Sequence, residues 1–145
     1  MTHEFEGHYR AKHAPNAQLD PALAERVREK AKDGHLPCAS AFTIAEERGT
    51  SPNEVGRVAD LLEIKITKCQ LGLFGYMKER RNIVEPAGGV SAELERALRK
   101  GIVNGRLPCK KAWDIARDLG LSKTEITASC ERLNIRLGPC QLGTF

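Results

Sequence analysis

The sequence predicts a mainly α-helical protein made of two tandem three-helix units, each ending in a short strand or small wing. Three observations indicate this class: the chain repeats itself once, each copy carries apolar residues at helical spacing, and glycine or capping residues stand where helices would end and begin. The composition agrees, because 145 residues that are 41% hydrophobic and 29% charged suit one or two small globular bodies with a buried core.

The repeat becomes visible when the chain is shifted by 71 positions, which aligns residues 19–74 with residues 90–145 without a gap. Nineteen of the 56 aligned pairs are identical, including the segments Leu-Pro-Cys and Cys-Gln-Leu-Gly, so the chain is a duplication. The tail carries His3, His8 and His13 and is expected to be solvated. The expected parts are a polar N-terminal tail (residues 1–18), repeat 1 (19–76), a linker (77–89) and repeat 2 (90–145).

The first two helices of each repeat follow from their caps and apolar spacing. In repeat 1, Asp20 is an N-cap before a proline, and apolar residues recur every four positions after it, while a serine caps the same helix in repeat 2. Gly34 and Gly105 are expected to be left-handed C-terminal caps of this helix. The second helix is expected over residues 38–48 and 109–119, and each copy begins directly after a proline.

The third helix of each repeat begins at a serine. Ser51 and Ser122 each stand three residues before a glutamate, which is the pattern of a capping box. The alternating residues 64–67 and 135–137 then predict a short strand. In repeat 2, Pro139 would confine this strand to the edge of a sheet.

The spacing around the junction of the second and third helices is specific. Ala45, Gly49 and Val55 stand at intervals of four and six residues, a serine follows the glycine by two, and repeat 2 has the same spacing. This pattern resembles the helix-turn-helix of bacterial transcriptional regulators, and the trailing strand makes it similar to the winged subtype. A small residue lets the two helices approach, glycine takes the tight turn, and a β-branched residue fills the core between them.

The resemblance implies binding of double-stranded DNA, with the third helix in the major groove and the second helix near the phosphate backbone. The implied base-facing residues in repeat 1 are Asn53, Gly56 and Arg57. In repeat 2 the implied base-facing residues are Lys123, Thr124, Thr127 and Ala128. The implied phosphate-facing residues are Lys110 and Lys111, with Arg106 nearby, against Ala39 and Ser40 in repeat 1.

Charge favours repeat 2 as the main DNA-contacting unit. Residues 19–76 hold 8 basic and 9 acidic residues, whereas residues 90–145 hold 10 and 6. In repeat 1, Glu54 and Asp60 lie on or near the expected reading surface, where they would repel a polyanion. We therefore expect a DNA-binding transcriptional regulator that reads DNA mainly through repeat 2.

Four of the five cysteines occupy matching places in the two repeats. Cys38 and Cys109 begin the second helix, where the helix dipole favours a thiolate, and Cys69 and Cys140 follow the short strand. The resemblance to winged folds implies that this strand pairs with the residues just before the second helix, which would bring the two cysteines of each repeat together. Three explanations stay open: core packing, a zinc or iron–sulfur site, and redox sensing. Cys130 is expected in the core.

Two further functional hypotheses share the same scaffold. The protein could be a metal or thiol sensor, or an adaptor that binds a protein partner through Phe74, Tyr76 and the acidic third helix of repeat 1. An enzyme is not expected and no cofactor is required, because the common nucleophile, metalloprotease, phosphate-loop and dinucleotide motifs do not occur. A cytoplasmic protein without membrane contact is expected, because no apolar run reaches about 18 residues. A homodimer is left open.

Overall fold

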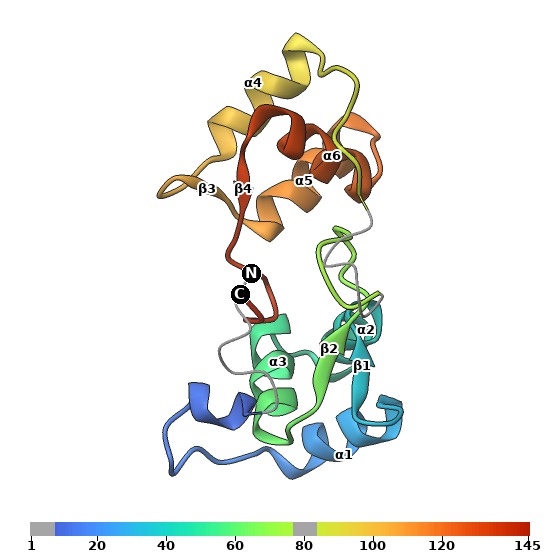
Figure 1. Ribbon diagram of the computed structural model, residues 1–145. Coiled ribbons are helices and arrows are strands. Elements are labelled where there is room, and N and C mark those ends of the chain that lie inside the picture. The colour runs from blue at the N-terminus through green and yellow to red at the C-terminus, as the bar shows by residue number, and fades with distance from the viewer. Residues whose placement is uncertain (1–7, 77–83) are drawn as a thin grey trace. The chain divides into compact units, whose positions relative to one another are not determined.

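The computed structural model describes residues 8–76 and 84–145, in which α-helices predominate and strands are short (Figure 1). The predicted mainly α fold class is therefore confirmed. The chain forms two compact units. Unit 1 contains the described residues up to Cys69 together with Leu142–Phe145, and unit 2 contains Gln70–Gln141.

Unit 1 packs three helices around a two-stranded parallel sheet. Its elements in chain order are η1 (Tyr9–Lys12), α1 (Pro21–Lys30), β1 (His35–Pro37), α2 (Cys38–Arg48), α3 (Pro52–Leu61) and β2 (Lys65–Thr67). The sheet places Leu36 beside Ile66. The residues before the second helix therefore pair with the strand after the third helix, as the sequence predicts.

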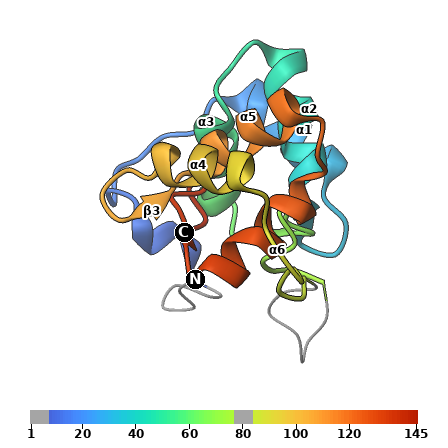
Figure 2. The same ribbon diagram turned by 90° about the horizontal axis from the view of Figure 1, so that it is seen from above.

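Unit 2 has the same arrangement without a counterpart of η1 among its described residues. Its elements are α4 (Ala92–Gly101), β3 (Arg106–Leu107), α5 (Cys109–Leu119), α6 (Lys123–Leu133) and β4 (Arg136–Leu137). The strands β3 and β4 are parallel and place Leu107 beside Leu137. Within this unit, α5 packs against both α4 and α6 (Figure 2).

The turns between the second and third helices follow the predicted chemistry. Gly49 and Gly120 end α2 and α5 in the left-handed conformation, with φ of +61° and +67°. Ser122 forms the full capping box with Glu125. Ser51 accepts the backbone N–H of Glu54 but receives no reciprocal bond. The carboxylate of Glu54 is paired with Arg57 instead, which is why repeat 1 lacks the second half of the box.

The capping box supports a test of the start of α6. The backbone N–H and the side chain of Ser122 form hydrogen bonds to the Glu125 carboxylate and lower its pKa. These bonds therefore stabilise unit 2 at neutral pH, and their contribution is lost as acid protonates the carboxylate. We expect Ser122→Ala to destabilise unit 2 by about 0.5–2 kcal/mol. The pKa of Glu125 should rise only part of the way toward its ordinary value, because the variant loses the side-chain bond and keeps the stronger backbone one. Denaturant unfolding and a carboxyl NMR titration measure the two effects. An unchanged Glu125 titration in the variant would contradict the assignment.

The expected position of the first-helix caps is wrong. The C-cap of α1 is Ala31, in an extended conformation, rather than Gly34. Gly34 follows Asp33 in a tight turn, where both residues have positive φ, and Asn104 and Gly105 form the same turn in unit 2. Two successive residues with positive φ suit a type I′ hairpin turn. The glycine therefore marks a positive-φ position, but in the turn that leads into the strand.

The two units exchange the segments that follow their last strand. We call residues 70–76 the first exchanged segment and Leu142–Phe145 the second exchanged segment. The first comes from repeat 1 but belongs to unit 2, and the second comes from repeat 2 but belongs to unit 1. Leu71 is 0% exposed and Leu142 is 2% exposed, so each segment contributes a core side chain. Each unit therefore contains the helices and strands of one repeat and the C-terminal segment of the other repeat.

The linker expected at residues 77–89 is described only in its second part. There Ala87 donates its backbone N–H to the carbonyl of Ala128 on α6. Throughout residues 8–76 and 84–145, the helices are too short or too polar to cross a bilayer.

Candidate nucleic-acid interface

The third helix of unit 1 is covered by other parts of the chain. Asn53 is exposed at its start, but Gly56 is buried beneath Leu142 of the second exchanged segment. A Cβ built on Gly56 would lie 1.7 Å from the Leu142 carbonyl oxygen. Arg57 is half-buried and donates to Glu54 and to the carbonyl of Gln18. The expected position of Gly56 on an open reading face is therefore wrong.

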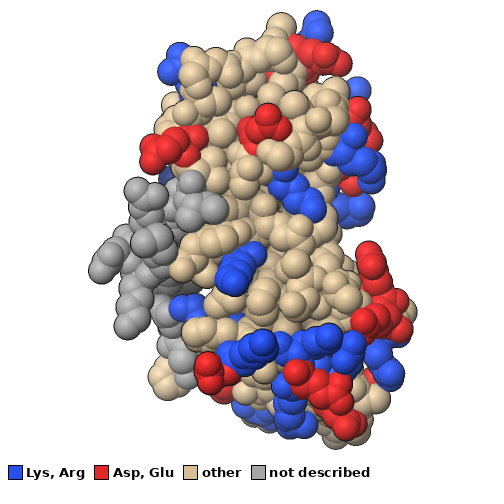
Figure 3. Space-filling model, turned by 90° about the vertical axis from the view of Figure 1, so that its right-hand side faces the viewer, with Lys and Arg blue, Asp and Glu red and all other residues tan. Residues whose placement is uncertain are grey.

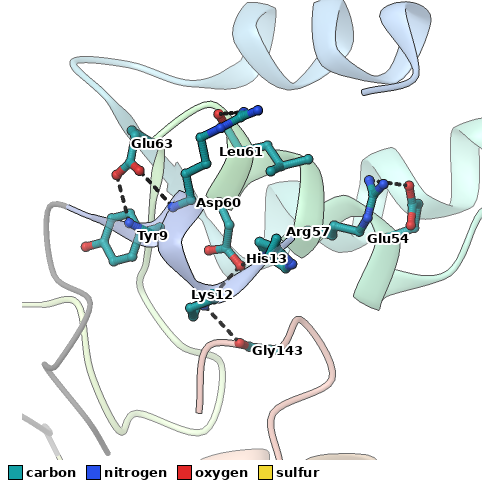
Figure 4. A network of polar contacts seen from close by, with 10 residues as sticks. Tyr9, Lys12, His13, Glu54, Arg57, Asp60, Leu61, Glu63 and Gly143 are labelled. Carbon is teal, nitrogen blue, oxygen red and sulfur yellow. Dashed lines mark hydrogen bonds and ion pairs between the residues drawn. The ribbon is translucent and has the colours of Figure 1, made fainter. Parts of the chain in front are cut away.

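Lys12 of the N-terminal segment links Asp60 on α3 to the second exchanged segment, as Figure 4 shows. The Asp60 carboxylate lies 3.0 Å from Lys12 Nζ and 2.9 Å from His13 Nε2. Lys12 Nζ also donates to the carbonyl of Gly143 at 3.1 Å. This carboxylate, expected to repel DNA, instead pairs with Lys12 and is hydrogen-bonded to His13 within unit 1.

Glu63, two residues past α3, holds η1. Its carboxylate accepts the backbone N–H groups of Tyr9 and Arg10 at 2.8 and 2.7 Å (Figure 4). Arg10 also donates a guanidinium N–H to the carbonyl of Leu61. A carboxylate is well placed at the start of a helical turn, where N–H groups lack partners. Residues 9–13 are therefore docked on unit 1 rather than free in solvent, although none of them is buried. His8 is exposed, and His3 lies outside the described residues.

In unit 2, the expected base-facing residues of α6 are engaged within the unit. Thr127 is 1% exposed, and its hydroxyl donates to the carbonyl of Lys123. Lys123 Nζ donates to Gln70 Oε1 of the first exchanged segment at 2.8 Å and lies 4.0 Å from the centre of the Trp113 ring. Thr124 is half-buried, with its hydroxyl 3.3 Å from Ser122 Oγ. Thr127 therefore does not face an open groove, contrary to expectation.

The expected phosphate-facing residues of unit 2 are exposed. Arg106 lies on β3, and Lys110 and Lys111 lie in the first turn of α5. Lys110 is paired only loosely, 3.6 Å from Asp114, and its side chain is 73% exposed. The sheet adds Arg136, which stands directly beside Arg106 in the register of β3 and β4.

We call Arg106, Arg136, Lys110 and Lys111 the basic surface of unit 2. Arg136 is not among the residues expected from the sequence, although the alternation of residues 135–137 places it on the polar side of the strand. Partners across a ladder project to the same side, and like charges there are destabilising unless a counter-charge lies between them. Two adjacent arginines therefore favour an anion on this side of the sheet.

Unit 1 lacks an equivalent concentration of charge among its described residues. Its sheet places His35 beside Lys65, and the second and third residues of its α2 are Ala39 and Ser40, where α5 has two lysines. Its cations are mixed with carboxylates, as in the pairing of the half-buried Arg26 with Glu47 and Glu29. The lower half of Figure 3 shows this mixture of blue and red side chains on one face of unit 1. The structure thus agrees with the sequence in making unit 2 the more cationic body.

The surfaces named by the adaptor hypothesis are largely internal. Phe74 is 7% exposed, Tyr76 is half-buried, and the Asp60 carboxylate of α3 is hydrogen-bonded to the N-terminal segment. These side chains contribute to the folded units, so they offer a partner little accessible surface.

The matching cysteines lie in the same local positions in both units. Cys38 and Cys109 are the first residues of α2 and α5, and both are buried. Cys69 is buried just beyond β2, and Cys140 is half-buried just beyond β4. Groups of three or more potential metal-ligating His, Cys, Asp or Glu side chains are not found among the described residues.

Cys130 differs from these four. Burial, and then the charge of Glu131, raise the pKa of its thiol to about 12, so it stays neutral inside unit 2. Its exposed fraction is 1%, which confirms the expected core position.

A scan of protein-family models, a search of curated proteins and a search of solved structures find no match to this chain. The case for any activity therefore depends on the residues described above.

Proposed function

We propose that this protein binds double-stranded DNA through the basic surface of unit 2. The observation that carries the proposal is the pair Arg106 and Arg136, held side by side on two short strands and followed along the chain by two exposed lysines. A guanidinium can donate two parallel N–H bonds to a phosphate, so two adjacent arginines suit a phosphate backbone. Phosphate contacts of this kind supply most of the affinity of sequence-independent binding.

The start of α5 supports the same ligand chemistry. This helix has 11 residues, and its N-cap residue is Pro108, which provides no side-chain cap. The positive end of the helix dipole therefore adds to the charges of Lys110 and Lys111 rather than being offset by a capping carboxylate. The strands and the helix of unit 2 thus each contribute exposed cations.

The proposal concerns binding to the phosphate backbone rather than base recognition. Lys123 is bonded to Gln70, and Thr127 is buried, so α6 does not offer these two side chains to base edges. We therefore expect DNA binding with little sequence preference while the first exchanged segment stays in place. A role in transcription would then depend on DNA shape or on a further partner.

The test is a salt titration of DNA affinity. Wild-type protein is expected to bind duplex DNA at low ionic strength, with log affinity falling linearly against log salt concentration. Replacing the four cations of the basic surface by glutamine is expected to reduce that slope by about 0.9 for each phosphate that the variant no longer neutralises. Arg28→Gln, at an exposed position of α1 in unit 1, is the matched control and should leave the slope unchanged.

Sequence dependence is measured in the same assay. Competitor duplexes of unrelated sequence are expected to displace a labelled duplex almost equally, and Thr124→Ala should alter neither affinity nor preference. An unchanged slope in the four-site variant would refute the assignment of the surface. Absence of salt-dependent binding to every duplex would refute DNA binding itself.

A further inference from the structure

A backbone hydrogen bond in unit 2 brings Cys109 close to Cys140. The ladder of β3 and β4 ends at Leu107 and Leu137, two and three residues before these cysteines. Beyond it, the amide of Cys109 donates to the carbonyl of Pro139, the residue before Cys140, at 3.1 Å. Standard bond lengths on either side of this hydrogen bond keep the Cα atoms of the two cysteines within about 7 Å of each other.

The surroundings of Cys109 favour negative charge on its sulfur. Gln141 donates its side-chain N–H to Cys109 Sγ at 3.4 Å. Cys109 is the first residue of α5, where the positive end of the dipole lies, and Lys110 and Lys111 follow it. Hydrogen-bond donors, a helix N-terminus and nearby lysines all stabilise a thiolate.

We propose that Cys109 and Cys140 together bind a soft monovalent d10 cation, Cu⁺, as a two-coordinate bis-thiolate. Thiolate ligands select soft metals, and two of them complete the linear coordination that Cu⁺ accepts, whereas structural Zn²⁺ takes four ligands. Binding releases both thiol protons: two Cys–SH and Cu⁺ give one Cu(S–Cys)₂⁻ and two H⁺. The product carries one negative charge, which the start of α5 and the adjacent lysines stabilise.

Unit 1 repeats the pair with weaker support. Cys38 begins α2 and Cys69 follows β2, as in unit 2, and both are buried. Ala39 and Ser40 replace the two lysines. Gln70, the counterpart of Gln141, belongs to unit 2, where it accepts from Lys123. Copper binding at unit 1 is therefore expected to be weaker than at unit 2.

The experiment titrates the full chain with Cu⁺ under anaerobic, reducing conditions, in competition with a chromogenic Cu⁺ chelator. The tightest phase of binding is expected to contain one Cu⁺ per chain, bound to two sulfur atoms by X-ray absorption. Cys109→Ser and Cys140→Ser should each abolish that phase. Cys130→Ala, which introduces the residue found at the matching position of repeat 1, is the control and should retain it.

A second measurement uses the unaltered chain, so that loss of folding in a serine variant does not decide the result. Alkylation with iodoacetamide is followed by peptide mass spectrometry, with and without Cu⁺. One equivalent of Cu⁺ should slow the labelling of both Cys109 and Cys140 at least tenfold. Equal labelling with and without Cu⁺ would overturn the proposal, as would a first metal ion with three or four sulfur ligands. DNA affinity is not used as a readout, so failure here leaves the DNA proposal to its own test.

Discussion

Gly56→Ala is expected to destabilise unit 1 by about 1–3 kcal/mol, which is the usual cost of inserting atoms into a filled site. At a solvent-exposed position inside a helix, replacing glycine by alanine would instead stabilise the helix by about 1 kcal/mol. Here the added Cβ would lie 1.7 Å from the Leu142 carbonyl oxygen and 2.7 Å from its carbonyl carbon. Both atoms belong to backbone, so the second exchanged segment has to move as a whole.

The measurement is denaturant unfolding combined with amide hydrogen exchange. The variant should lose stability and show faster exchange in α3 and in the N-terminal segment that contacts it. Gly101→Ala in α4 is the matched control, because its Cβ would meet Leu107 Cδ1 at 2.9 Å, a side-chain end that can rotate away. That variant should unfold at nearly the wild-type denaturant concentration. Stabilisation by Gly56→Ala would show that the segment does not lie on α3 in solution.

Leu142→Ala and Leu71→Ala are each expected to cost about 2–5 kcal/mol, because both side chains are nearly or fully buried. The informative result is which unit shows faster hydrogen exchange in each variant. Leu142 lies in repeat 2 but belongs to unit 1, so its truncation should accelerate hydrogen exchange in α1–α3. Leu71 lies in repeat 1 but belongs to unit 2, so its truncation should accelerate exchange in α4–α6.

The opposite pattern would contradict the exchange of segments. If each leucine stabilised the repeat that contains it, Leu142→Ala would loosen α4–α6 and Leu71→Ala would loosen α1–α3. Val103→Ala provides a control, because this side chain is 49% exposed and its truncation should leave exchange in both units unchanged.

The sequence predicts the local structure well because local chemistry determines it. The prolines before α2 and α5, the left-handed Gly49 and Gly120, and the serine caps act over a few residues, and each helix lies where they indicate. The prediction for Gly34 is wrong because a helix cap and a tight turn both require positive φ. A single local signal does not distinguish those two uses.

The covering of α3 and α6 is not predictable in the same way. Both repeats contain the same Cys-Gln-Leu-Gly segment, so the apolar pattern is identical whether each segment stays in its own unit or is exchanged. The contacts of Asp60 with Lys12 and His13 likewise join residues far apart in the chain. The exposure of the lysines and arginines of unit 2 can be predicted, because these residue types are usually exposed whatever the rest of the fold contains.

The second exchanged segment also affects the order in which the two units can complete their folding during synthesis. Lys12 and Gly143, which are joined by a hydrogen bond in unit 1, are 131 residues apart. On a translating ribosome, the helices of unit 1 emerge first, yet Leu142 is added to the chain only after all of α4–α6. Unit 2, by contrast, receives a segment that has already been synthesised when its own helices appear. We therefore expect the first unit synthesised to be the last to complete its core, which reverses the usual sequence of co-translational folding.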